Sequence, residues 1–301
     1  MRSSGNSGLP GRSPDRAEAQ DAKRNSGHSQ NCLYVVGIGP GSKDHLTKRA
    51  VDVLNGVDVV VGYTTYIDLI RPLIEGKETI STGMTKEVKR VELAVETALA
   101  GKKCAIVSSG DPGIYAMAGL VFETCKIKNI PVSRPDDSKF NGDGNAPLRI
   151  EIVPGIPALS AGASLLGAPL MHDFAVISLS DLLTPWELIE QRLEAAGRAD
   201  FVVVLYNPKS KKRTWQLERA QQILLSHRAP NTPVGIVVSA MRDQQSIEIV
   251  PLERLHAADV NMQTTVFIGS STSGRYADFM FTPRGYSDKY VIGENKTINE
   301  D

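Results

Sequence analysis

The chain has 301 residues, of which 41% are hydrophobic, and its 34 basic and 34 acidic side chains give a net charge of zero. This length suits two domains of about 100–150 residues each, and the balanced charge excludes the general positive field that a nucleic-acid-binding protein needs. The three cysteines form no Cys-x-x-Cys pair and the five histidines show no metal spacing, which predicts no disulfide framework and no protein-bound metal. No run of about 20 apolar residues is present, so we expect a cytoplasmic protein with no membrane partner.

Residues 1–31 are polar and rich in Ser, Gly and Arg, with no apolar run. Such a segment cannot bury enough surface to order itself, so we expect a disordered leader. Its acidic residues Asp15, Glu18 and Asp21 argue against a transit peptide, and it lacks the apolar core of a secretory signal.

The first predicted unit is a strand, a glycine loop and a helix. Residues 33–36 form an apolar run, the loop 37–42 follows, and apolar residues then recur at helical spacing up to Val57, with Ser42 as a possible helix cap. A dinucleotide-binding reading does not fit, because Ser42 replaces the third glycine of that pattern and the acid Asp58 precedes its strand.

A second strand over 57–62, a helix over 88–99 and a buried strand over 104–107 continue this alternation, which predicts a parallel sheet. The last of these strands runs into Ser109-Gly-Asp-Pro112. Loops at the carboxyl ends of parallel strands are where ligands bind in open α/β sheets. Residues 133–147 are polar and predict an inserted surface loop without chemistry.

The rest of the chain again alternates strands and helices. A strand over 148–153 leads into Val153-Pro-Gly-Ile-Pro-Ala158 and a helix of small residues over 159–166, and Thr184 to Glu187 reads as a capping box. Further strands are predicted over 175–179, 201–205, 234–238, 247–250 and 265–269. We expect an N-terminal α/β domain over 32–170 and a C-terminal α/β domain over 171–301.

Three motifs in this order, Val36-Gly-Ile-Gly-Pro-Gly41, Ser109-Gly-Asp-Pro112 and Val153-Pro-Gly-Ile-Pro-Ala158, resemble the tetrapyrrole (corrin and porphyrin) methyltransferase family. The resemblance covers almost everything from Leu33 to Pro283. It implies two α/β domains with an interdomain cleft, a homodimer, and S-adenosylmethionine as methyl donor.

Within that family, residues 205–213, 172–174 and 177–181 resemble the branch that methylates C17 of precorrin-3B and contracts the ring during cobalamin biosynthesis. By this resemblance the cofactor would be lined by Pro40, Ser109, Gly110, Asp111, Ile114, Pro157, Ala158, Asn207 and Ala240. Asn207 departs from the methionine of some relatives, so we expect it to contact the cofactor through its backbone.

A corrinoid tetrapyrrole carries many carboxylates, which a neutral protein must meet with local cations. The candidates for substrate binding are Lys209, Lys211, Lys212, Arg213 and Arg242. Ring contraction also requires proton movement, for which a carboxylate or histidine is suited. The candidates for this catalytic role are Asp44, His45, Asp111 and Asp181, and the sequence does not choose between them.

Other functions remain open at this point. The same fold serves methylation at other corrinoid carbons, such as C11 of precorrin-4, and methylation of diphthine or RNA, although the zero net charge argues against RNA. A nucleotide-dependent oxidoreductase and a non-catalytic corrinoid-binding module are the alternatives from other classes. The sequence does not say whether the substrate already contains cobalt.

Overall fold

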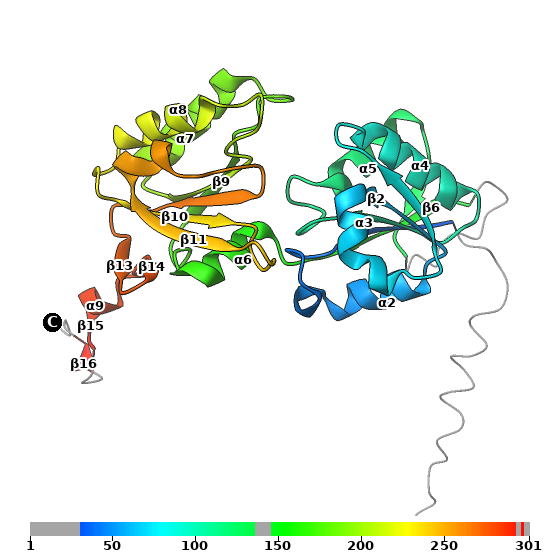
Figure 1. Ribbon diagram of the computed structural model, residues 1–301, viewed down its shortest axis with the longest axis horizontal. Coiled ribbons are helices and arrows are strands. Elements are labelled where there is room, and N and C mark those ends of the chain that lie inside the picture. The colour runs from blue at the N-terminus through cyan, green and yellow to red at the C-terminus, as the bar shows by residue number, and fades with distance from the viewer. Residues whose placement is uncertain (1–30, 136–145, 293–295, 298–301) are drawn as a thin grey trace, which may run out of the picture.

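The computed structural model describes residues 31–135, 146–292 and 296–297. Its two large sheets lie in separate halves of the molecule (Figure 1). All but the last residue of the predicted leader, and most of the predicted surface loop 133–147, lie outside the described residues.

The first half is a parallel sheet with helices on both faces. Its six strands run in the order β3-β2-β4-β1-β6-β5, and every pair is parallel, as the alternation of strands and helices predicted. The strands are β1 (Cys32–Gly37), β2 (Val59–Tyr63), β3 (Glu78–Thr82), β4 (Cys104–Ser108), β5 (Val132–Ser133) and β6 (Leu148–Val153). The helices are α2 (Lys48–Gly56), α3 (Thr64–Ile70), α4 (Glu87–Leu99) and α5 (Met117–Ile127).

The core of this half forms two layers because side chains alternate across the sheet. Val35 of β1 faces α4 and α5, where it is buried with Val91 and Val121. The next residue, Val36, faces α2 and packs in a second cluster with Leu54 and Ile67. With both faces covered, the central strands are apolar throughout, which is why they could be recognised in the sequence.

The second half holds a mixed sheet in the order β11-β10-β12-β9-β8. Only β8 and β9 are parallel in it, and the other neighbours are antiparallel. Its strands are β8 (Phe174–Ser178), β9 (Val202–Tyr206), β10 (Pro233–Val238), β11 (Ser246–Pro251) and β12 (Thr264–Ile268). Helices α7 (Trp186–Arg198) and α8 (Gln216–Leu225) cover one face together with the 3-10 helix Leu252–Ala257.

Helix α6 (Ala158–Leu166) covers the other face of the second sheet. Gly162 lets the Phe267 ring approach closely, and Leu166 packs over Gly235. Strand β7 (Gly167–Ala168) then pairs with β14 (Phe279–Phe281), which follows β13 (Gly274–Tyr276). The chain continues with α9 (Tyr286–Lys289), β15 (Tyr290–Val291) and β16 (Lys296–Thr297). The domain boundary after residue 170 stays a prediction.

Two predicted caps differ in the structure. Ser42 caps the short 3-10 helix Lys43–His45, with its Oγ 3.2 Å from the Asp44 nitrogen, and α2 is instead capped by Thr47, whose Oγ1 accepts from the Ala50 nitrogen at 3.2 Å. The capping box at 184–187 was wrong. Pro185 is the N-cap of α7 and no side chain caps that helix, because proline has no side-chain oxygen to accept from the first backbone N–H groups.

Candidate active site

The glycine loops of the first half meet at the carboxyl ends of β1, β4 and β6. Gly110 exchanges two backbone hydrogen bonds with Gly39, of 2.7 and 3.2 Å. The backbones are so close that a Cβ on Gly155 would lie 2.2 Å from the Gly110 oxygen, and one on Gly37 would lie 2.6 Å from the same atom. Only glycine permits this contact, which places the three loops at one edge of the sheet.

The carboxylate of Asp111 joins two of these loops. Its Oδ1 accepts a hydrogen bond from the Gly113 nitrogen at 2.8 Å, within its own turn, and its Oδ2 accepts from the Gly155 nitrogen at 3.2 Å. A carboxylate that accepts backbone N–H groups on both oxygens holds the main chain in place. Asp111 therefore fixes the shape of the loops that follow β4 and β6.

Arg242 reaches this edge from the second half. Its Nε donates to the Pro40 oxygen at 2.5 Å and its Nη2 donates to Ser109 Oγ at 3.0 Å. Gly41 leaves the room that this side chain occupies, because a Cβ there would lie 2.6 Å from the Arg242 Nε. Burial lowers the pKa of the Arg242 guanidinium, and the nearby Tyr66 opposes that shift.

Two tyrosines complete the junction between the halves. The rings of Tyr115 and Tyr206 lie 5.3 Å apart, and the Tyr115 hydroxyl donates to the Val176 oxygen of β8 at 3.0 Å. The Tyr206 hydroxyl accepts from the nitrogen of Leu159, in the first turn of α6, at 2.8 Å. Burial raises the pKa of Tyr206 to about 12, so its phenol stays protonated at neutral pH.

These elements enclose a cavity of about 480 Å³ between the halves. Its volume lies within the range of small-molecule and cofactor sites. All nine residues predicted to contact the cofactor line it, which brings together loops that are far apart in the sequence. They are Pro40, Ser109, Gly110, Asp111, Ile114, Pro157, Ala158, Asn207 and Ala240.

Asn207 occupies the cavity wall in a left-handed backbone conformation, with φ of 52°. Asparagine tolerates this conformation better than most residues. Its side-chain Nδ2 donates to Ser178 Oγ at 2.9 Å, and its carbonyl accepts from Arg213 Nε at 3.1 Å. The side chain is thus engaged within the protein.

The predicted substrate cations fall into three groups. Arg242 lines the cavity. Arg213 is buried, and besides the Asn207 carbonyl it donates to Ser180 Oγ at 3.4 Å, so it shapes the loop after β9. The other three side chains are exposed and do not line the cavity. They are Lys209, Lys211 and Lys212.

The four catalytic candidates are not brought together. Asp111 lines the cavity, whereas Asp44, His45 and Asp181 do not. Asp44 is exposed in the first turn after the glycine loop. The exposed Asp181 accepts a hydrogen bond from Gln216 Nε2 at 2.9 Å.

Sequence reasoning missed the end of the cavity that lies beyond β2 and β3. There the wall includes Tyr63, Tyr66, Met84, Glu87 and Arg90. One signal was present in the sequence, since Arg90 shares the buried face of α4 with Ala94 and Ala98 at a spacing of four residues. A charged residue in such a stripe is unusual unless it has a partner.

Neither a metal centre nor a membrane-spanning helix is found in the described part of the chain. No group of three or more His, Cys, Asp and Glu side chains there is arranged to hold a metal ion. No helix among these residues has the length and apolar character needed to cross a membrane.

Comparisons with known proteins agree with this architecture. Residues 32–256 match the family described as Tetrapyrrole (Corrin/Porphyrin) Methylases. The cobalt-factor III methyltransferase of Priestia megaterium is 48% identical over 264 residues, which are 88% of this chain but only 47% of that protein, so the chain spans about half of that relative's length. The probable cobalt-factor III C(17)-methyltransferase of Salmonella typhimurium is 43% identical over 85% of this chain and 99% of its own length.

Among solved structures, that of the methyltransferase CobJ superimposes with a TM-score of 0.74 at 35% identity, covering 83% of this chain and 99% of that one. The fold class and the family resemblance inferred from the three motifs are therefore confirmed. The chain belongs to the Tetrapyrrole (Corrin/Porphyrin) Methylases.

Proposed function

We propose that this protein transfers a methyl group from S-adenosylmethionine to C17 of precorrin-3B or its cobalt form, with contraction of the ring, in cobalamin biosynthesis. The observation that carries this proposal is the match to the Salmonella relative, which extends over nearly the whole of that protein. A cytoplasmic location belongs to the same proposal.

The cavity fits the proposed methyl donor. Residues of the loops after β1, β4 and β6 line it, and one of them is Gly110, which has no side chain to stand between a ligand and the main chain. The aromatic pair Tyr115 and Tyr206 borders it, and aromatic faces attract a cation such as a sulfonium. When bound, S-adenosylmethionine supplies an electrophilic methyl group. The residues around it have to orient the donor and exclude water, because methyl transfer depends chiefly on alignment.

The proton movement of ring contraction needs a titratable group at the cavity. Of the four candidates, Asp111 lies there, and both of its carboxylate oxygens already accept backbone hydrogen bonds, from Gly113 and Gly155. We assign Asp111 the role of holding the two loops in place, and we consider proton transfer by Asp111 a secondary role. Asp44, His45 and Asp181 keep the catalytic assignment only if the bound substrate extends beyond the cavity.

The proposal includes a homodimer. Its support is a group of exposed apolar side chains on the C-terminal segment, which projects from the second half (Figure 1). Tyr276 is 77% exposed, Phe279 56% and Tyr286 64%. Exposed aromatic residues in such number are typical of an interface. Light scattering on the wild type and on Phe279→Glu tests this, since a dimer that uses this surface should dissociate in the variant.

The decisive experiment is a single-turnover incubation under anaerobic conditions with metal-free and with cobalt-containing precorrin-3 substrates. S-adenosylmethionine labelled with carbon-13 in its methyl group should give one labelled methyl at C17 of a ring-contracted product, located by NMR. A label at C11 would assign the alternative activity. Binding of the tetrapyrrole without any transfer would identify a corrinoid-binding module instead.

A further inference from the structure

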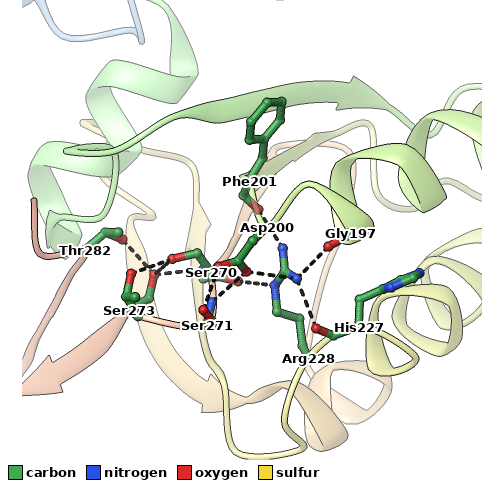
Figure 2. A network of polar contacts seen from close by, with 11 residues as sticks. Gly197, Asp200, Phe201, His227, Arg228, Ser270, Ser271, Ser273 and Thr282 are labelled. Carbon is green, nitrogen blue, oxygen red and sulfur yellow. Dashed lines mark hydrogen bonds and ion pairs between the residues drawn. The ribbon is translucent and has the colours of Figure 1, made fainter.

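Two buried arginines of this protein have very different surroundings. Arg228, 6% exposed, lies between α8 and β10 in the second half, with its side chain beside Gly269 at the carboxyl end of β12. Its guanidinium forms an ion pair of 3.0 Å with Asp200 Oδ1. Figure 2 shows that it also donates to the carbonyl oxygens of Gly197 and Phe201, at 2.7 and 3.0 Å. Its charge and its donors are therefore satisfied inside the protein, and it has a structural role.

Arg90, in the first turn of α4, is buried even more deeply, with 4% of its surface exposed. Its Nε donates to Thr82 Oγ1 at 2.8 Å and its Nη2 to the Gly83 oxygen at 3.0 Å, while Nη1 lies 3.8 Å from Met117 Sδ. No carboxylate of the described residues forms an ion pair with it. Glu87, three residues earlier at the start of the helix, favours the charged form of Arg90 only at longer range.

The uncompensated charge of Arg90 faces the cavity. Arg90 lines the wall beyond β2 and β3 together with Tyr63, whose ring centroid lies 5.9 Å from the guanidinium carbon. Arg242 lines the same cavity, and it too has no carboxylate partner within the described ranges. Burial lowers the pKa of both arginines, although neither loses its proton at neutral pH.

Such a site is built for an anion. A guanidinium has five N–H donors, and the neutral acceptors around Arg90 use two of them well and a third weakly. A buried cation without a counter-charge is costly, and a bound carboxylate offsets that cost because it matches the fork of the guanidinium. The Arg228 site, by contrast, holds its own carboxylate.

We infer that Arg90 binds a carboxylate of the tetrapyrrole substrate at the end of the cavity beyond β2 and β3. This inference rests on the proposed function. The other source of a carboxylate is the amino-acid part of the methyl donor. The order of the strands favours the tetrapyrrole. The loops predicted to hold the donor follow β4, β1 and β6, whereas Arg90 lies at the carboxyl ends of β2 and β3, on the side of the sheet where β3 is the outermost strand.

The test separates binding of the two ligands. Tetrapyrrole affinity is measured by absorbance titration with S-adenosylhomocysteine present, which prevents turnover, and S-adenosylhomocysteine affinity is measured alone by calorimetry. Arg90→Met should weaken the tetrapyrrole by about 10- to 100-fold and leave S-adenosylhomocysteine binding unchanged. Arg71→Met is the charge-matched control. It removes an exposed arginine of the same half that pairs with Asp68 outside the cavity, and it should alter neither affinity.

Arg90→Lys keeps the charge without the fork and should weaken the tetrapyrrole less than Arg90→Met does; it also serves if the methionine variant does not fold. Wild-type tetrapyrrole affinity in both folded variants would overturn the inference while leaving the proposed function in place. Loss of S-adenosylhomocysteine affinity alone would assign the carboxylate to the methyl donor and overturn the substrate assignment. A wild-type enzyme that neither binds nor methylates the tetrapyrrole would overturn both.

Discussion

Replacing Gly155 by alanine should damage the site through the main chain alone. The new Cβ would lie 2.2 Å from the Gly110 oxygen and 2.8 Å from the Gly37 carbonyl carbon, where an ordinary contact is 3.4 Å or longer. The loops must therefore separate by about 1 Å, which would break the Gly110 to Gly39 hydrogen bond of 2.7 Å. Overpacking costs about 1–3 kcal/mol and a lost hydrogen bond about 1 kcal/mol more, so we expect a loss of about 2–4 kcal/mol of unfolding free energy.

Differential scanning calorimetry should show this loss as a fall in melting temperature of about 5–15 °C. Calorimetric titration should show weaker binding of S-adenosylhomocysteine. Gly119→Ala is the matched control, since that glycine is exposed within α5 and a Cβ there meets nothing within 4 Å. It should stabilise the protein by about 0.5–1 kcal/mol. If Gly155→Ala melts and binds like the wild type, the close contact of the three loops does not exist in solution.

Three further predictions concern side chains. Asp111→Ala should weaken S-adenosylhomocysteine by about 5- to 150-fold without unfolding the protein, since it frees the Gly155 loop; unchanged affinity in calorimetry would remove Asp111 from the site. Lys209→Glu with Lys211→Glu should raise the Michaelis constant for tetrapyrrole and flatten the increase of that constant with salt. Kinetics equal to the wild type at every ionic strength would show that these lysines do not contact the substrate. The buried Arg213 is left unchanged because it donates to the Asn207 carbonyl. Burial raises the pKa of the Cys104 thiol from 9.0 to about 12. Only the unfolded thiol then ionises between these values, so the unfolding free energy should fall as pH rises through that window, and less steeply in Cys104→Ala; identical slopes in denaturant titrations would contradict this.

The sequence predicted those parts of the fold that are buried on both faces. β1, β2 and β4 are short apolar runs because helices cover both sides of them, whereas β6 alternates its first apolar residues with the half-buried Arg149 and Glu151. β3 was missed because it is the edge strand, and its residues Glu78, Thr79 and Ser81 are exposed. An edge strand that is not apolar carries no pattern that distinguishes it from a loop.

The part of the cavity wall where we expect the cofactor could be predicted from the family resemblance, whose motifs lie in loops that directly follow the recognisable strands. The far end of the cavity could not. Tyr63 and Arg90 come from segments whose meeting depends on the order of β3, β2 and β4 in the sheet, and no local pattern specifies that order. Lys209, Lys211 and Arg213 were all predicted to bind substrate carboxylates, yet Arg213 turns inward while the two lysines remain exposed. This difference depends on the neighbouring Asn207 carbonyl, which accepts from Arg213.

The two hydrogen bonds that Arg242 donates to Pro40 and Ser109 bear on the order in which the protein folds during synthesis. Its two acceptors lie 202 and 133 positions earlier in the chain. All strands of the first sheet end by Val153, so that sheet has every strand it needs well before Arg242 is translated. Contacts of such long range form late because the intervening chain must be ordered first. During synthesis the cavity is therefore completed only after the second half has been translated and folded, and we expect the chain to bind its ligand no earlier than that.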